Sequence, residues 1–106
     1  MGNYLRTYRK RSGLSQLDVG LLLGYRTKAQ VSRHERARTQ PPLVIALAYE
    51  VIFHAPVSAL FAQAHANARR SVDKKLVAFE IRLNGTGRVK RATAQKKAWL
   101  TEHRTL

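Results

Sequence analysis

The chain has 106 residues, with 20 Lys+Arg against 6 Asp+Glu and a formal net charge of +14. This length favours one domain with an appended arm, and 44% hydrophobic residues exclude a chain that is only a disordered basic tail. The absence of cysteine excludes disulfides, thiolate catalysis and cysteine-based zinc sites. Residues 1–61 and 62–106 are both basic, so we expect a polyanionic partner, with nucleic acid first.

Membrane association and export are not expected. The longest apolar run covers residues 43–49, far short of the roughly 20 residues that a membrane span needs. Basic residues near the N-terminus are followed by no apolar stretch of the kind found in a signal peptide. A small domain without cysteine fits a reducing compartment, so we expect a cytoplasmic, nucleoid-associated protein.

Two short helices with clear end signals are predicted first. Asn3 caps a helix that runs to about Ser12, and Gly13 ends it in the left-handed conformation. The second helix, residues 15–23, begins with a capping box between Ser15 and Asp18 and stops at Gly24. Gly20 inside it costs about 1 kcal/mol of helix propensity relative to Ala, which indicates a contact point where another helix comes close.

The next helix, residues 27–36, is predicted to start with a second capping box, between Thr27 and Gln30. Val31 is its only strongly apolar residue, so most of its surface should face outward. Residues 43–53 are strongly apolar and should form the buried centre, through Val44, Leu47, Ala48, Val51 and Ile52. Pro56 then starts another helix, and the core is completed by Val57, Leu60 and Phe61.

The helices at 15–23 and 27–36, joined by a short turn at Gly24, form a helix-turn-helix pattern. In this arrangement the first helix braces against the DNA backbone and the second enters the major groove. A helix in the groove needs hydrogen-bonding groups on its outer face. The second helix carries such groups at Lys28, Gln30, Ser32, Arg33 and Arg36.

Particular residues make the pattern more specific. They are Leu5-Arg6, Arg9, Gly13-Leu14-Ser15-Gln16, Val19, Leu23-Gly24, Val31-Ser32-Arg33, Glu35, Pro42, Ala46-Leu47-Ala48 and Val57-Ser58-Ala59-Leu60-Phe61. Through them, residues 5–61 resemble the Cro/C1-type (XRE-family) helix-turn-helix domain. The resemblance implies an all-α, five-helix, lambda-repressor-like domain over residues 1–61. It also implies binding to double-stranded DNA, usually as a homodimer on palindromic half-sites.

The resemblance also implies site residues. Base contacts are expected from Lys28, Ala29, Gln30, Ser32 and Arg33, and backbone contacts from Gln16, Arg26, Thr27, Arg36, Arg38 and Thr39. Lys28 and Arg33 are the main candidates for guanine readout, whereas Gln30 has the alternative of closing the capping box. Gln16 is expected near a phosphate, where it can also brace the helix at 27–36. Arg9 and Glu35 are expected to form a partly buried ion pair.

Three positions depart from the family pattern. The turn of residues 24–27 is one residue longer than in the commonest members, which leaves the register of base contacts open by one residue. His34 stands where an apolar residue is usual. Ala37 stands where glycine often follows, so the loop is expected to bend differently.

Residues 62–106 are predicted to form a basic helical C-terminal arm. Ala64, Ala68, Val72, Leu76, Phe79 and Leu83 follow helical spacing. Residues 84–87 should break this helix, and a last one is expected over about 93–103. Alternation over residues 79–83 before a glycine-rich turn leaves a β-hairpin as the alternative.

The arm has three candidate roles. Its stripe of Val72, Leu76, Phe79 and Leu83 can pair with a second copy, or Trp99 and Leu100 can fold back on it within one chain. Its cations can also follow flanking DNA. They are Arg69, Arg70, Lys74, Lys75, Arg88, Lys90, Arg91, Lys96 and Lys97.

Enzymatic and metal chemistry are not expected. The six acids are scattered, no glycine-rich phosphate loop occurs, and His34, His54 and His65 lack a metal-binding partner set. The sequence therefore predicts a transcriptional regulator without a cofactor, most simply a dimeric repressor. An antitoxin that also binds a toxin and a sequence-indifferent DNA- or RNA-binding protein are the alternatives, and the polymerase is a further candidate partner.

Overall fold

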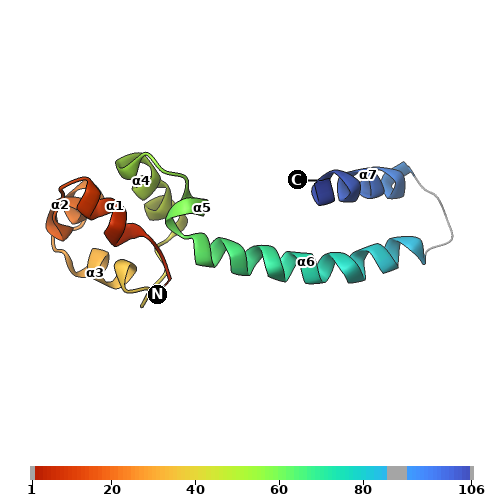
Figure 1. Cartoon of the computed structure of the whole chain (residues 1–106), viewed down its shortest axis with the longest axis horizontal. Coiled ribbons are helices and arrows are strands. Elements are labelled where there is room, and N and C mark those ends of the chain that lie inside the picture. Colours follow the sequence, from red (N-terminus) through yellow and green to blue (C-terminus); the bar gives the residue numbers. More distant parts are fainter. Residues whose placement is uncertain (1, 86–90, 106) are drawn as a thin grey trace. The chain divides into compact units, whose positions relative to one another are not determined.

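The computed structural model describes residues 2–85 and 91–105, and every regular element in these residues is a helix (Figure 1). The chain divides into two compact units, Met1–Asn67 and Ala68–Leu106. The sequence predicts this boundary between residues 61 and 62. In the structure the first unit extends further, because Ala64 still packs against its core.

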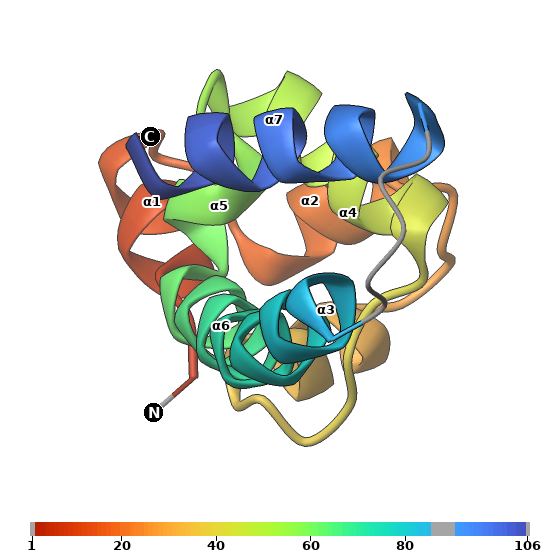
Figure 2. The ribbon, with the colours of Figure 1, turned by 90° about the vertical axis from the view of Figure 1, so that its right-hand side faces the viewer.

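The first unit contains the five predicted helices and the start of a sixth. The helices are α1 (Leu5–Arg11), α2 (Gln16–Leu22), α3 (Ala29–Glu35), α4 (Leu43–Phe53), α5 (Val57–Leu60) and α6 (Ala62–Asn84). In both views of the ribbon, α3 and α4 lie on opposite sides of this unit (Figures 1 and 2). The predicted all-α helix-turn-helix fold is confirmed.

Each of the five helices contributes one fully buried side chain to the core. These side chains are Leu5, Val19, Val31, Tyr49 and Leu60, all at most 1% exposed. Tyr49 stacks on Phe53 with ring centroids 6.0 Å apart and meets Phe61 edge-on at 6.3 Å. Burial of one such apolar side chain stabilises the fold by about 1.5–3 kcal/mol, so the five contacts fix the helix arrangement.

The first three helices end in the same way. In each, the amide two residues past the helix cap returns to a carbonyl near the helix end, as in a Schellman motif. Leu14 N donates to Arg9 O at 3.3 Å, Tyr25 N to Gly20 O at 2.8 Å, and Arg38 N to Arg33 O at 3.0 Å. The motif needs one residue with positive φ. Gly13 has φ 73°, as the sequence predicts, Gly24 has φ 92°, and Ala37 has φ 55°.

The start and the middle of α2 also follow the prediction. The Ser15 hydroxyl accepts from the Asp18 amide at 3.0 Å, and an Asp18 carboxylate oxygen accepts from the Ser15 amide at 2.9 Å. The backbone and side-chain hydrogen bonds from Ser15 lower the pKa of Asp18. At Gly20, an added Cβ would lie 2.7 Å from the Thr27 carbonyl oxygen, so a close approach is present, although it comes from the turn before α3 and not from a helix.

Two predicted helix starts are wrong in detail. The α1 cap position is Tyr4, although the Asn3 carboxamide does accept from the Leu5 amide at 3.1 Å. The capping box at Thr27 and Gln30 does not form, because α3 begins at Ala29 with Lys28 at the cap position. The Thr27 hydroxyl accepts instead from the Ala29 amide at 3.3 Å, as in a local turn.

The predicted buried face of α4 is mostly wrong. Val44 and Val51 are 75% and 73% exposed, and Leu43 and Leu47 are also exposed. The face that packs inward carries Ala46, Tyr49 and Phe53, with Ile52 and Ala48 partly buried. Because α4 is apolar on almost every side, spacing alone did not distinguish its two faces.

The second unit is a helical hairpin formed by α6 and α7 (Arg91–Thr105). Leu83 and Leu100 are buried, and the Phe79 and Trp99 rings meet edge-on at 6.4 Å. Trp99 also stacks on His103, whose Nε2 lies 3.9 Å from Asp73 Oδ1. Residues 79–83 are helical, so the β-hairpin alternative is wrong, and Trp99 and Leu100 fold back within the chain as one reading predicted.

Candidate nucleic-acid interface

Helix α3 has one face in the core and one in solvent. Val31 is fully buried and His34 is 2% exposed, three residues further along the same face. Lys28, Ala29 and Arg33 are exposed on the other side. The inward face therefore holds the helix in place while the outward face stays available to a ligand.

A charged cluster joins α3 to α1 and α2. Arg9 Nε donates to Glu35 Oε2 at 2.6 Å, and Arg9 Nη2 donates to Glu35 Oε1 at 3.2 Å. Gln16 Nε2 donates to the same Oε1 at 3.1 Å. The Glu35 side chain is only 4% exposed, so its charge is compensated inside the unit. The structure thus brings Arg9, Gln16 and Glu35 together, and loss of one partner would leave a buried charge unpaired.

His34 has a structural role that the sequence reasoning missed. Its Nδ1 lies 2.9 Å from the Tyr49 hydroxyl, and its carbonyl accepts from the Asn3 side chain at 2.7 Å. Burial lowers the pKa of His34 and, with a contribution from the charge of Glu35, raises the pKa of Tyr49. The spacing of three from Val31 was the available signal for this position, since it places both residues on one helix face.

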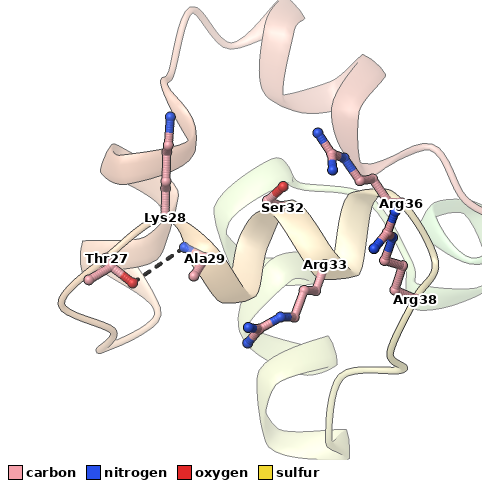
Figure 3. A pocket seen from close by; sticks show the side chains of 7 residues that line it. All are labelled: Thr27, Lys28, Ala29, Ser32, Arg33, Arg36 and Arg38. Atoms are coloured by element: carbon pink, nitrogen blue, oxygen red, sulfur yellow. Dashed lines mark hydrogen bonds between the residues drawn. The ribbon is translucent and has the colours of Figure 1, made fainter.

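The exposed side of α3 borders a surface hollow of about 370 Å³, which we call the α3 hollow (Figure 3). It is lined by Thr27, Lys28, Ala29, Ser32, Arg33, Arg36 and Arg38. Lys28, Arg33 and Arg36 extend away from the helix in Figure 3. Within the residues that the structure describes, these three side chains make no hydrogen bond or ion pair. The hollow therefore presents unneutralised cations, as an anionic ligand requires.

The end of α3 directs two of these cations. Ala37 N donates to His34 O at 3.1 Å, and this hydrogen bond and the one from Arg38 N together make up the Schellman motif. The loop thus bends as glycine would allow, contrary to our expectation for alanine. Arg36 and Arg38 flank this turn, and both reach the α3 hollow.

The remaining predicted contact residues lie apart from the α3 hollow. Gln30 is half-buried, and Arg26 and Thr39 are exposed. Gln16 lines a second hollow between α1, α2 and α3, of about 640 Å³, which we call the α1 hollow. Its lining also includes Arg6 and Thr7, which sequence reasoning missed although Arg6 lies one helical turn before Arg9.

The cations predicted to contact DNA from the arm can be located only in part. Lys96 and Lys97 are exposed on α7, and Arg69, Arg70, Lys74 and Lys75 are exposed on α6. Arg88 and Lys90 lie outside the described residues, as does the side chain of Arg91. Among the described residues, no three His, Asp or Glu side chains group as a metal site would need, and no helix is long and apolar enough to cross a membrane.

Comparison with known proteins assigns the first unit. No curated protein and no solved structure gives a significant match. A family model described as a helix-turn-helix domain matches residues 1–55, which is more than half of the chain and includes the whole of α1, α2 and α3. The chain therefore belongs to the helix-turn-helix domain family.

Proposed function

We propose that this protein is a sequence-specific, double-stranded DNA-binding regulator of the Cro/C1 type that reads the major groove with residues 27–36. The observation that carries this proposal is the α3 hollow, where exposed cations without internal partners stand on a helix fixed from behind. A major groove accepts one α-helix, and Lys or Arg on its outer face pairs with guanine. The first helix of the motif, α2, then rests on the DNA backbone.

The proposal assigns two classes of contact. Base edges are read by Lys28, Ala29, Gln30, Ser32 and Arg33, and phosphates are bound by Gln16, Arg26, Thr27, Arg36, Arg38 and Thr39. Arg33 is the sharpest candidate for base readout, because it is exposed in the middle of α3. Arg38 lies in the loop beyond α3 and is the matched candidate for a phosphate contact.

The test is selection of bound duplexes from a random pool, followed by titration of two variants. We expect a motif whose symmetry and spacing report the half-sites. Arg33→Ala should lose about 1–3 kcal/mol of binding free energy and relax the sequence preference at one base position. Arg38→Ala should weaken binding to every sequence alike. If no motif emerges and random DNA competes fully at about 150 mM salt, the sequence-indifferent alternative holds.

We further propose that the regulator is a homodimeric repressor, which blocks polymerase when it occupies its own binding site on the DNA. The predicted dimer stripe is partly used within the hairpin, because Leu83 is buried and Phe79 packs on Trp99. The support for a dimer is that Val72, Val77 and Ile81 remain exposed on α6. Val77 and Ile81 are one helical turn apart, and adjacent exposed apolar side chains favour association. Purification with a small partner protein instead of a second copy would favour the antitoxin alternative.

A further inference from the structure

The α1 hollow is a second candidate anion site in the first unit. It is lined by Asn3, Arg6, Thr7, Arg9, Gln16, Glu35 and Arg36. These residues come from α1, α2 and α3 and from the segments next to them. Arg36 also lines the α3 hollow, so the two hollows share one cation.

The charges around the α1 hollow favour an anion. Glu35 contributes the negative charge of the lining, and both of its carboxylate oxygens already accept hydrogen bonds from Arg9. Arg6 and Arg36 are exposed, and neither makes a hydrogen bond or ion pair in residues 2–85 and 91–105. Two guanidinium groups are therefore left over once the internal ion pair has formed.

The donors at this hollow also fit one kind of anion. A guanidinium group binds phosphate oxygens through two parallel N–H donors, and the exposed Thr7 hydroxyl beside Arg6 supplies a further donor. Continuity through Arg36 makes the next phosphates of the same DNA strand the natural occupant. A DNA strand presents successive phosphates along this line of cations, whereas a free phosphate does not.

We propose that Arg6 and Thr7 on α1 bind a DNA backbone phosphate next to the groove that α3 enters. This inference rests on the proposed function and extends its contact surface to a helix that the sequence analysis left without a DNA role. Phosphate contacts set position and affinity but carry no base information. The site should therefore strengthen binding equally on cognate and unrelated duplexes.

The test compares three variants by titration between about 50 and 300 mM salt, where counterion release dominates. Arg6→Ala should bind both duplex types several-fold more weakly, with the salt dependence reduced by about one phosphate contact. Thr7→Val should weaken binding but keep the salt dependence, because the hydroxyl is neutral. Lys10→Ala is the control, since Lys10 is exposed on α1 but does not line the hollow. The melting temperature should not change in any of them.

Ethylation interference gives the direct readout. Wild-type protein should show one sensitive phosphate that disappears from the pattern of Arg6→Ala and remains in that of Lys10→Ala. An unchanged pattern and salt dependence for Arg6→Ala, or the same change for Lys10→Ala, would overturn this site while leaving the proposed function intact. A wild-type chain that binds no duplex at any salt concentration would overturn both.

Discussion

At the scale of single residues, the least expected feature is the buried pair of His34 and Tyr49 beneath α3. Histidine stands where an apolar residue is usual, and the Tyr49 hydroxyl satisfies its Nδ1 inside the core. Protonation of a buried imidazole is costly because the low dielectric disfavours the charged form. The stability of the fold therefore depends on pH through this pair.

We predict that the free energy of unfolding falls as the pH decreases below 6.5. Burial lowers the pKa of folded His34 below its ordinary value of 6.5, so the unfolded chain binds more protons in this range. The stabilisation is complete above pH 6.5 and is lost as the pH falls toward the folded-state pKa. Urea unfolding followed by circular dichroism from pH 8 to pH 5 measures it.

Variants of the pair separate this effect from that of the other histidines. His34→Leu should flatten the pH profile but cost about 1–3 kcal/mol at pH 7, because the Tyr49 hydroxyl loses its partner. The double variant His34→Leu, Tyr49→Phe should recover much of that loss. His65→Ala is the control, since His65 is exposed in a helix. A profile for His34→Leu as steep as that of wild type would show that another group is responsible.

At the scale of elements, the contact between α2 and the turn before α3 sets the geometry of the helix-turn-helix pair. We predict that Gly20→Ala destabilises the first unit, although alanine improves helix propensity by about 1 kcal/mol. The new Cβ would lie 2.7 Å from a backbone carbonyl that cannot rotate away. Leu21→Ala, on an exposed side of α2, is the control that should change stability little. Thermal melts compare the two, and a Gly20→Ala chain that melts above wild type would contradict this account.

The elements that could be predicted from the sequence are those with local signals. The Ser15–Asp18 capping box, the positive φ at Gly13 and the close approach at Gly20 each depend on one or two residue types with few alternative uses. The α4 face could not be predicted, because a helix with Val44, Leu47 and Val51 on one side and Tyr49 on another is apolar in both directions. The hollow at α1 was missed for a further reason: it needs three helices to be packed before its lining exists.

At the scale of the whole molecule, opposite responses to salt should separate dimerisation from DNA binding. Residues 62–106 carry 11 Lys+Arg against 3 acids, so two arms repel each other until salt screens the charges. We predict that self-association strengthens with salt while duplex binding weakens. Ile81→Glu should reduce association, and Ala94→Glu, with the same change in charge on an exposed position of α7, should not. Sedimentation equilibrium measures the self-association of both variants. Equal effects of the two variants would exclude the arm as the interface.

The left-handed backbone at Ala37 has a consequence for how this protein can evolve. Alanine at φ 55° destabilises the folded state by about 1–2 kcal/mol, which glycine avoids. Glycine loses only part of this advantage through the greater conformational freedom of its unfolded chain. Libraries screened for heat tolerance should therefore return Ala37→Gly repeatedly. Arg36 and Arg38 lie on either side of this residue, so duplex binding by Ala37→Gly would report whether the more stable chain keeps the loop conformation.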